Sequence, residues 1–456
     1  MQNINDYLKQ NKDRQLKELM EFLTIPSISA QSKHKADIGA AANWLATHLK
    51  KIGMEHAKVI KTKGHPIVYA DHLKAKGKPA KTTVLIYGHY DVQSSDPLDQ
   101  WNSEPFKPTV RNGNLYGRGT ADDKGQLFTH LKALEAFLAV EGRLPVNVKF
   151  MFEGEEELGS AHLTDFVEKN KKMLSADICL ISDSHMASPT QPLMEYGLRG
   201  IVYTQINLAT MPRDAHSGTY GGNIPNPAIE LANLITKFKD ERTQKILIPG
   251  FYDDVRGLSI QERFDLRKSS ITKKAIINET GVKRVMGETG FFEPERAGAR
   301  PTLDINGMWS GYIDEGQKTI IPARASAKIS MRLVPYQKSS DIAKKFTRYV
   351  KAMAPKYTDV DVEILSASEP ILMQKDNKYF KVAEAALKEV FGSAPRYELQ
   401  GGSIPVTATV KAVLGMDSVL MGFGLPDDGL HSPNEKLNLE MFYKGIECSV
   451  RFFQLL

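Results

Sequence analysis

Residues 82–93 read TTVLIYGHYDVQ, an almost unbroken apolar run followed by a histidine and an aspartate. Such a run predicts a β-strand that is covered on both faces, as in the parallel part of an α/β sheet. Similar runs follow at 146–152 (VNVKFMF) and 178–182 (ICLIS), and residues 125–140 have a helical pattern. We therefore expect the first part of the chain to form an α/β domain.

Histidines and carboxylates stand where these strands are predicted to end. In an open α/β sheet, ligands bind beyond the carboxyl ends of the strands, so side chains from separate strands can converge on one point. The candidates, with two more from glycine-containing turns, are His89, Asp91, Asp122, Glu156, Glu157, Asp183 and His431.

Two of these motifs have a simpler interpretation when each is taken alone. His89 could ligate a metal through one ring nitrogen while Asp91 holds the other ring N–H, but a lone histidine is more often satisfied by a backbone carbonyl. The run 153–160 (EGEEELGS) could be a solvated acidic turn. Its position after a buried strand favours one carboxylate as a metal ligand and a second that takes a proton from water.

The glycine-rich stretch 117–125 (GRGTADDKG) leads into a predicted helix. Its spacing matches neither the P-loop nor the dinucleotide fingerprint, and two adjacent aspartates would repel a phosphate. A carboxylate that bridges two cations is the better use of Asp122, although capping of the helix by Asp122 or Asp123 is the alternative. Taken together, the motifs predict a two-metal hydrolytic site whose N/O donors suit zinc, manganese or cobalt.

The pattern changes near residue 200. Polar and apolar residues alternate at 201–208 and 325–333, which indicates strands with one solvated face. Helices at 226–239 and 340–354 and a strand at 360–365 suit a β-α-β-β-α-β order, the ferredoxin-like motif, whereas 240–292 follows no clear pattern. A helix at 378–391 and an apolar strand at 418–423 then return to the α/β pattern of the first part of the chain. We expect a catalytic domain at 1–199 and 368–456, interrupted by an inserted domain at 200–367.

Composition excludes several classes of protein. The chain has 456 residues, which favours at least two domains, and its net charge of +6 includes no long basic tract, so we expect no nucleic-acid partner. Cys179 and Cys448 belong to no paired motif and are expected to be buried thiols. Because no signal peptide or membrane span is evident, we expect a cytoplasmic protein without a membrane partner.

At this point the sequence resembles a known family, the di-metal exopeptidases that include glutamate-releasing carboxypeptidase, aminoacylase, succinyl-diaminopimelate desuccinylase and carnosine-type dipeptidases. The resemblance covers nearly the whole chain and is closest to the cytosolic non-specific (carnosine-type) dipeptidase branch. The motifs that carry it are GHYDVQ at 88–93, RGTADDKG at 118–125, RDAHSG at 213–218, GGSIP at 401–405 and HSPNE at 431–435.

The resemblance implies a role for each candidate in a centre of two divalent cations. Asp122 would bridge the cations, with His89 and Asp183 completing one site and Glu157 and His431 completing the other. Glu156 would be the general base and Asp91 would orient His89. The family also implies a cis peptide between Asp122 and Asp123.

The inserted domain is implied to be a ferredoxin-like α+β lid and dimerisation domain on a mixed-sheet α/β metallo-hydrolase domain. In similar enzymes the histidine at His216 reaches across a homodimer interface and polarises the scissile carbonyl in the partner subunit. Arg332 resembles the arginine that grips the terminal carboxylate of the substrate. Thr319, Gly402 and Ser403 resemble neighbouring substrate contacts.

The resulting expectation is a dipeptidase that hydrolyses a small peptide with a metal-bridging hydroxide and Glu156 as base. Hydrolysis of N-acyl amino acids at the same centre is the alternative, and Gln400, where the carnosine branch often has an acidic residue, leaves the peptide preference open. A binding module that has lost activity is disfavoured, because such a chain would be expected to lack Glu156 or a metal ligand.

Overall fold

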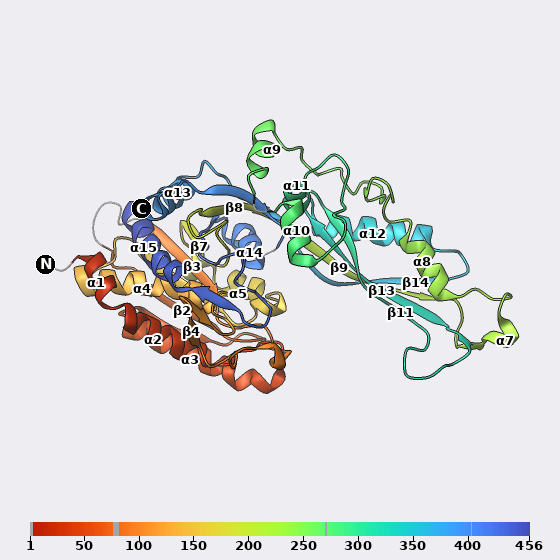
Figure 1. Ribbon diagram of the computed structural model, residues 1–456, viewed down its shortest axis with the longest axis horizontal. Coiled ribbons are helices and arrows are strands. Elements are labelled where there is room, and N and C mark those ends of the chain that lie inside the picture. The colour runs from red at the N-terminus through yellow and green to blue at the C-terminus, as the bar shows by residue number, and fades with distance from the viewer. Residues whose placement is uncertain (1–2, 76–81, 270, 403) are drawn as a thin grey trace. The chain divides into compact units, whose positions relative to one another are not determined.

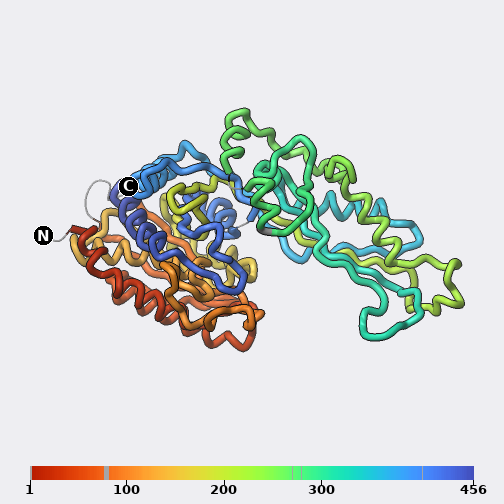
Figure 2. Tube along the Cα trace, in the orientation of Figure 1, coloured from red at the N-terminus to blue at the C-terminus, as the bar shows by residue number. Residues whose placement is uncertain are grey.

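The computed structural model describes residues 3–75, 82–269, 271–402 and 404–456, and the chain forms two compact units. Unit 1 comprises Met1–Tyr196, Met373–Tyr397 and Pro405–Leu456, and unit 2 comprises Gly197–Leu372 and Glu398–Ile404. The N-terminal and C-terminal segments therefore both belong to unit 1, as the red and blue ends of the trace show (Figure 2).

Unit 1 is built on a six-stranded mixed sheet with the order β1-β2-β6-β3-β7-β17. Strands β6, β3, β7 and β17 run parallel to one another, while β2 pairs antiparallel with both β1 and β6. The bounds are β1 (Glu55–Ile60), β2 (Ile67–His72), β3 (Thr83–His89), β6 (Asn147–Glu153), β7 (Ile178–Ile181) and β17 (Ser418–Leu420). The predicted mixed α/β fold is confirmed, because the apolar runs form the buried parallel strands.

Helices cover this sheet (Figure 1). Helix α4 (Lys124–Glu141), which follows the glycine-rich turn, is buried along most of its length and packs against α15 (Leu439–Leu455). The others are α1 (Ile4–Gln10), α2 (Lys12–Leu23), α3 (Lys35–Lys51), α5 (Leu163–Lys169), α6 (Lys171–Leu174), α13 (Lys378–Phe391) and α14 (Pro405–Leu414). Burial of α4 on nearly all sides explains why its sequence lacks a polar face.

Two three-stranded sheets are also present among the described residues. One has the order β18-β5-β4 and joins β4 (Thr109–Arg111), β5 (Asn114–Tyr116) and β18 (Lys436–Asn438). The other has the order β15-β8-β16 and joins β8 (Leu193–Leu198), β15 (Ile371–Leu372) and β16 (Arg396–Gln400). The first sheet connects segments of the chain that are more than three hundred residues apart.

Unit 2 is a four-stranded antiparallel sheet with the order β11-β13-β9-β14. Helices α8 (Pro227–Ile235) and α12 (Ser339–Met353) pack on it through a core that includes Ile206, Leu231 and Phe346. The strands are β9 (Gly200–Ala209), β11 (Thr302–Ser310), β13 (Arg324–Leu333) and β14 (Asp359–Ser368), so the chain follows a β-α-β-β-α-β order.

Several details of unit 2 differ from the sequence expectations. Helix α8 ends at Ile235, and the segment 240–292 contains two short helices, α9 (Ile260–Leu266) and α10 (Lys273–Thr280). The stretch 398–404, expected in the catalytic domain, packs within unit 2: the Nε of Arg199 donates to the carbonyl of Gly401 at 2.9 Å. A Cβ on Gly298 of α11 (Glu293–Gly298) would lie 1.9 Å from the carbonyl oxygen of Leu399, which shows how closely the two segments pack.

Two expectations from composition can be compared with the structure. Cys179 and Cys448 are both buried and free. Within the described ranges, every helix is too short or too polar to cross a bilayer.

Candidate metal centre

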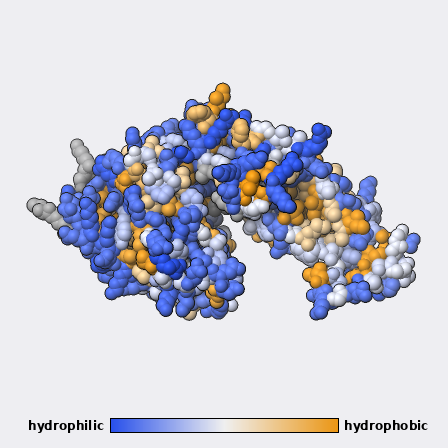
Figure 3. Space-filling view, in the orientation of Figure 1, coloured by the Kyte–Doolittle hydropathy of each residue, from blue (hydrophilic) through white to orange (hydrophobic). Residues whose placement is uncertain are grey.

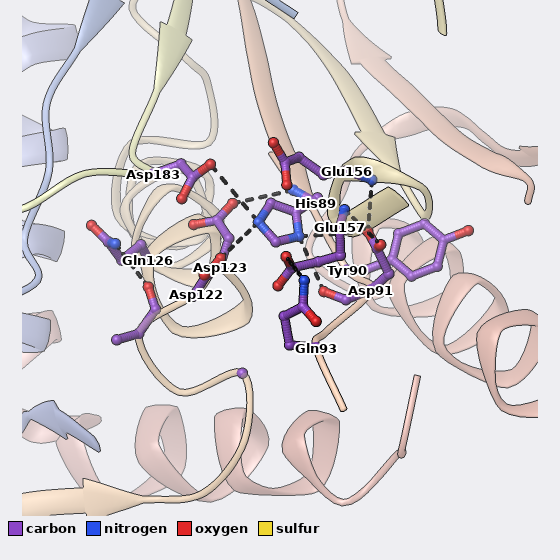
Figure 4. A network of polar contacts seen from close by, with 12 residues as sticks. His89, Tyr90, Asp91, Gln93, Asp122, Asp123, Gln126, Glu156, Glu157 and Asp183 are labelled. Atoms are coloured by element: carbon purple, nitrogen blue, oxygen red, sulfur yellow. Dashed lines mark hydrogen bonds and ion pairs between the residues drawn. The ribbon is translucent and has the colours of Figure 1, made fainter. Parts of the chain in front are cut away.

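The predicted ligands follow neighbouring strands of the unit 1 sheet. His89 ends β3, Asp183 lies two residues after β7, and Glu156 and Glu157 begin a 3-10 turn, η3 (Glu156–Leu158), after β6. Since β6, β3 and β7 are adjacent and parallel, their carboxyl ends lie at one edge of the sheet. Figure 4 shows these side chains around the ring of His89.

Two groups of donors form at this edge and share one carboxylate. In the first, His89, Asp122 and Asp183 each offer an atom within 4.8 Å of the others, and Asp122, Glu157 and His431 do the same in the second. Asp122 directs Oδ1 to His89 Nε2 at 2.9 Å and Oδ2 to His431 Nε2 at 2.9 Å. One carboxylate therefore faces both groups, as a bridging ligand must.

Buried polar atoms without hydrogen-bond partners test whether cations fit here. Among the described residues, Glu157 Oε1 is buried without a hydrogen-bond partner, and the buried His89 Nε2 faces carboxylate oxygens of Asp122 at 2.9 Å and Asp183 at 3.8 Å. The other ring nitrogen of His89, Nδ1, lies 3.0 Å from the carbonyl oxygen of Asp91, which places the ring proton on Nδ1. The Nε2 lone pair is then free for a metal, so the residues fit two divalent cations held by nitrogen and oxygen donors.

Asp91 supports the centre in a way that differs from the expectation. Its carboxylate Oδ1 is 3.5 Å from His89 Nδ1, and the shorter contact to the ring is made by its backbone carbonyl. The carboxylate instead accepts backbone N–H groups from Glu156 at 3.2 Å and Glu157 at 3.1 Å. Asp91 thereby joins the strand that carries His89 to the turn that carries the two glutamates.

The side chains of the centre have strongly shifted pKa values. Burial raises the pKa of Asp183 to about 7, and burial also raises the pKa of Glu156 well above its ordinary value. For Asp122 burial acts in the same direction, but hydrogen bonds to His431 and His89 outweigh it and lower the pKa. Hydrogen bonds to Asp122 and Glu157 raise the pKa of His431 to about 10. Divalent cations would stabilise the ionised carboxylates that burial disfavours.

Glu156 belongs to neither donor group. In Figure 4 no dashed contact meets its carboxylate, whereas Glu157 accepts a hydrogen bond from Gln93 Nε2 at 2.9 Å. A carboxylate beside the donors and unbound by them is suited to proton transfer rather than to ligation.

Two residues that hold the ligands in place, Asp123 and Glu435, were not predicted to support the metal centre. Asp123, which follows a cis peptide from Asp122, accepts the backbone N–H of His89 through Oδ2 at 3.1 Å. Glu435 accepts backbone N–H groups from the turn that carries Asp122. The signal in the sequence was that both residues belong to motifs of the family resemblance, RGTADDKG and HSPNE, which does not identify their partners.

The predicted substrate contacts lie at two opposite ends of unit 2. Near one end, the Arg199 N–H donates to the carbonyl of Gly402 at 3.1 Å, and Arg332 pairs with Ile201 of β9. Ser403 lies outside the described residues.

His216 and Thr319 lie beyond the other end. His216, in β10 (Ala215–His216), pairs with Ile320 of β12 (Ile320–Ile321), just before β13 begins at Arg324. Eight residues of strand separate Arg324 from Arg332, which is roughly 26 Å.

The fold and the two donor groups define the chain as a metal-dependent hydrolase with two cation positions. Residues 85–455 match the family described as Peptidase family M20/M25/M40. The chain belongs to this peptidase family, which confirms the resemblance seen in its sequence.

Three similar proteins show how far the likeness extends. The chain is 30% identical to Beta-Ala-His dipeptidase of Homo sapiens, covering 99% of this chain and 92% of the relative. It is 30% identical to a Cys-Gly metallodipeptidase of Schizosaccharomyces pombe, covering 98% and 96%. Among solved structures, an M20 family metallo-carboxypeptidase from Sulfolobus solfataricus is 33% identical with a TM-score of 0.86, covering 97% of this chain and 98% of that one.

Proposed function

We propose that this chain is a dipeptidase that hydrolyses the peptide bond of dipeptides at a centre of two divalent cations, zinc or manganese, with cobalt also suited. The observation that carries the proposal is Asp122, whose two oxygens face two separate donor groups. The relatives named above, a Beta-Ala-His dipeptidase and a Cys-Gly metallodipeptidase, support dipeptides as the substrate class.

Bound cations would polarise the peptide carbonyl and lower the pKa of water from about 16 toward 7. Glu156 accepts a proton from the attacking water and delivers it to the leaving amine. Its carboxylate is buried beside the donors, and this burial raises its pKa well above the ordinary value of a glutamate. Asp91 holds the N–H groups of η3 and so keeps the Glu156 carboxylate beside the donors.

The ferredoxin-like unit 2 is proposed to act as a lid and as the dimerisation domain. A dipeptide spans only about 7 Å, whereas roughly 26 Å of strand lies between Arg332 and the end that carries His216 and Thr319. One copy of unit 2 therefore cannot place both ends on the same substrate, and a second copy would supply the missing pair. Arg332 and Gly402, together with Ser403 as the resemblance implies, would hold the terminal carboxylate.

Exposed apolar side chains on unit 2 support such an association. Ile229 of α8 is 58% exposed, and Met308 and Trp309 of β11 are 46% and 41% exposed. Figure 3 shows hydrophobic surface over this part of unit 2. Apolar surface of this kind is typical of an interface between subunits.

His216→Ala is expected to lower kcat by roughly 100- to 1000-fold, the typical cost of losing a donor to the developing oxyanion. The Nδ1 of His216 accepts the N–H of Gly218 at 3.0 Å, so the neutral ring carries its proton on Nε2 and can donate outward. Steady-state kinetics on a dipeptide would measure the loss.

A mixture of His216→Ala and Glu156→Gln chains tests whether the histidine acts in the partner subunit. In a mixed dimer one site would combine an intact Glu156 with an intact His216, so an equimolar co-refolded mixture should recover about a quarter of the activity of a symmetric wild-type dimer. No recovery, with mixed dimers demonstrated by mass, would contradict a role across the interface.

Chelator-treated protein is expected to lose dipeptide hydrolysis and to regain it with zinc or manganese, because the N/O donors accept both ions. The panel would include free dipeptides, matching N-acetyl amino acids and longer peptides. Preference for the acetylated set would move the protein to N-acyl amino acid hydrolysis. Preference for longer peptides would instead fit the similarity to a metallo-carboxypeptidase.

A further inference from the structure

A fully buried glutamate lies behind the metal centre and binds four donors. The side chain of Glu435 is 0% exposed. Its Oε1 accepts the backbone N–H groups of Ala121 at 2.9 Å and Asp122 at 3.1 Å. Its Oε2 accepts the N–H of Gly119 at 2.9 Å and the Nη1 of Arg118 at 2.8 Å. Both oxygens are therefore satisfied by the turn that carries Asp122.

The backbone around Glu435 is attached to the same turn. Gly117 donates its N–H to the carbonyl of Glu435 at 3.0 Å, and Lys436 pairs with Tyr116 where β18 joins β5. His431 lies four residues before Glu435 in the same loop. The segment 431–435 therefore carries the ligand His431 and also, through Glu435, holds the turn that carries the ligand Asp122.

Arg118 extends this attachment to a third segment. Its Nη2 donates to the carbonyl of Ser432 at 3.2 Å, in the His431 loop, and to the carbonyl of Ser94 at 3.1 Å. Ser94 lies five residues after His89. A guanidinium can serve all of these acceptors because its donors are fixed in one plane.

The two donor groups differ in how much they depend on Glu435. In the second group, Asp122 lies on the turn whose N–H groups Glu435 accepts, and His431 lies on the loop that contains Glu435. In the first group, His89 is the last residue of β3 and Asp183 lies two residues after the paired end of β7. Sheet pairing therefore places these two ligands without help from Glu435.

We propose that Glu435 is a positioning residue that fixes Asp122 against the His431 loop and so sets the affinity of the centre for the cation held by Asp122, Glu157 and His431. The inference rests on the two-cation centre of the proposed function. It does not depend on the identity of the substrate, because it concerns metal binding.

Glu435→Gln tests the proposal, because the amide has nearly the same shape but presents N–H donors to N–H donors. Metal-free protein would be titrated with Zn²⁺ against a chromogenic chelator, which resolves the two binding steps. We expect one step to weaken by about 10- to 100-fold, the usual effect of losing a partner of a metal ligand. The affinity of the other Zn²⁺ binding step should stay within about threefold of its wild-type value.

Two further variants make the result specific. His431→Ala removes a ligand from the second group, so Glu435→Gln must weaken the same step that His431→Ala weakens. Glu440→Gln is the matched control, because Glu440 is exposed and pairs only with Lys444 among the ion pairs described for it. At saturating metal, kcat of Glu435→Gln should return to within about fivefold of wild type, since no reacting group is lost.

Equal weakening of both steps, or no weakening, would overturn the proposal. If Glu435→Gln does not fold, Arg118→Lys gives the same test, since it keeps the charge but loses the two-pronged contact. A selective loss of one step in a protein that cleaves no dipeptide would support the role of Glu435 and contradict the proposed function, so the two failures can be distinguished.

Discussion

Glu156→Gln is expected to lower kcat for dipeptide hydrolysis by roughly 100- to 10,000-fold, the usual contribution of a general acid–base group. The glutamine has the same size and can still accept a hydrogen bond, but it cannot take a proton from water. Because Glu156 belongs to neither donor group, both metal affinities should remain near those of wild type. Kinetics at saturating metal, combined with a metal titration, would separate the two effects.

Glu155→Gln is a matched control within the same acidic run. The carboxylate of Glu155 faces away to the ring of His162, with Nδ1 at 3.0 Å, so this change should leave kcat within a few-fold of wild type. If Glu156→Gln instead lost metal along with activity, Glu156 would be a ligand and the base would have to be sought elsewhere.

The parallel strands could be predicted from the sequence because each is a continuous apolar run that the sheet buries on both faces. Strand β11 could not, since residues 302–310 (TLDINGMWS) form an exposed edge whose register shifts between Ile305 and Gly307. The helices within 240–292 are similarly short and lie largely at the surface. Edge and surface elements carry little periodic signal, so their pattern was not informative.

The positions of His89, Glu157 and Asp183 were predictable for a local reason, since each lies at or just after the end of a recognisable strand, whereas Asp122 and His431 lie in turns. The contacts that hold these ligands in place could not be predicted from the sequence. Whether Asp91 reaches His89 through its carboxylate or its carbonyl depends on the path of two residues of backbone. The contact of Glu435 with Asp122 depends on the pairing of β18 with β5, two segments far apart in the sequence.

Asp122→Asn is expected to remove most of the activity by weakening both cation positions at once. The amide offers one oxygen where the carboxylate offers two, so it cannot face His89 and His431 with equivalent donors. Loss of the several kcal/mol that bound cations supply to the developing charge corresponds to about a thousandfold or more in kcat. Kinetics over a wide range of Zn²⁺ concentration would show whether added metal restores any of it.

Thermal unfolding gives a second measure that does not depend on substrate. A cation that binds only the folded chain stabilises it by about 2.7 kcal/mol at 100 times its Kd, so wild-type Tm should rise with Zn²⁺ while Asp122→Asn should show little rise. Asp427→Asn is the control, because Asp427 is exposed and its described ion pair is with Lys436, near the His431 loop but outside both donor groups. A full metal-dependent rise in the Asp122 variant would show that the two donor groups do not share this carboxylate, and the two-cation centre would have to be assigned to other ligands.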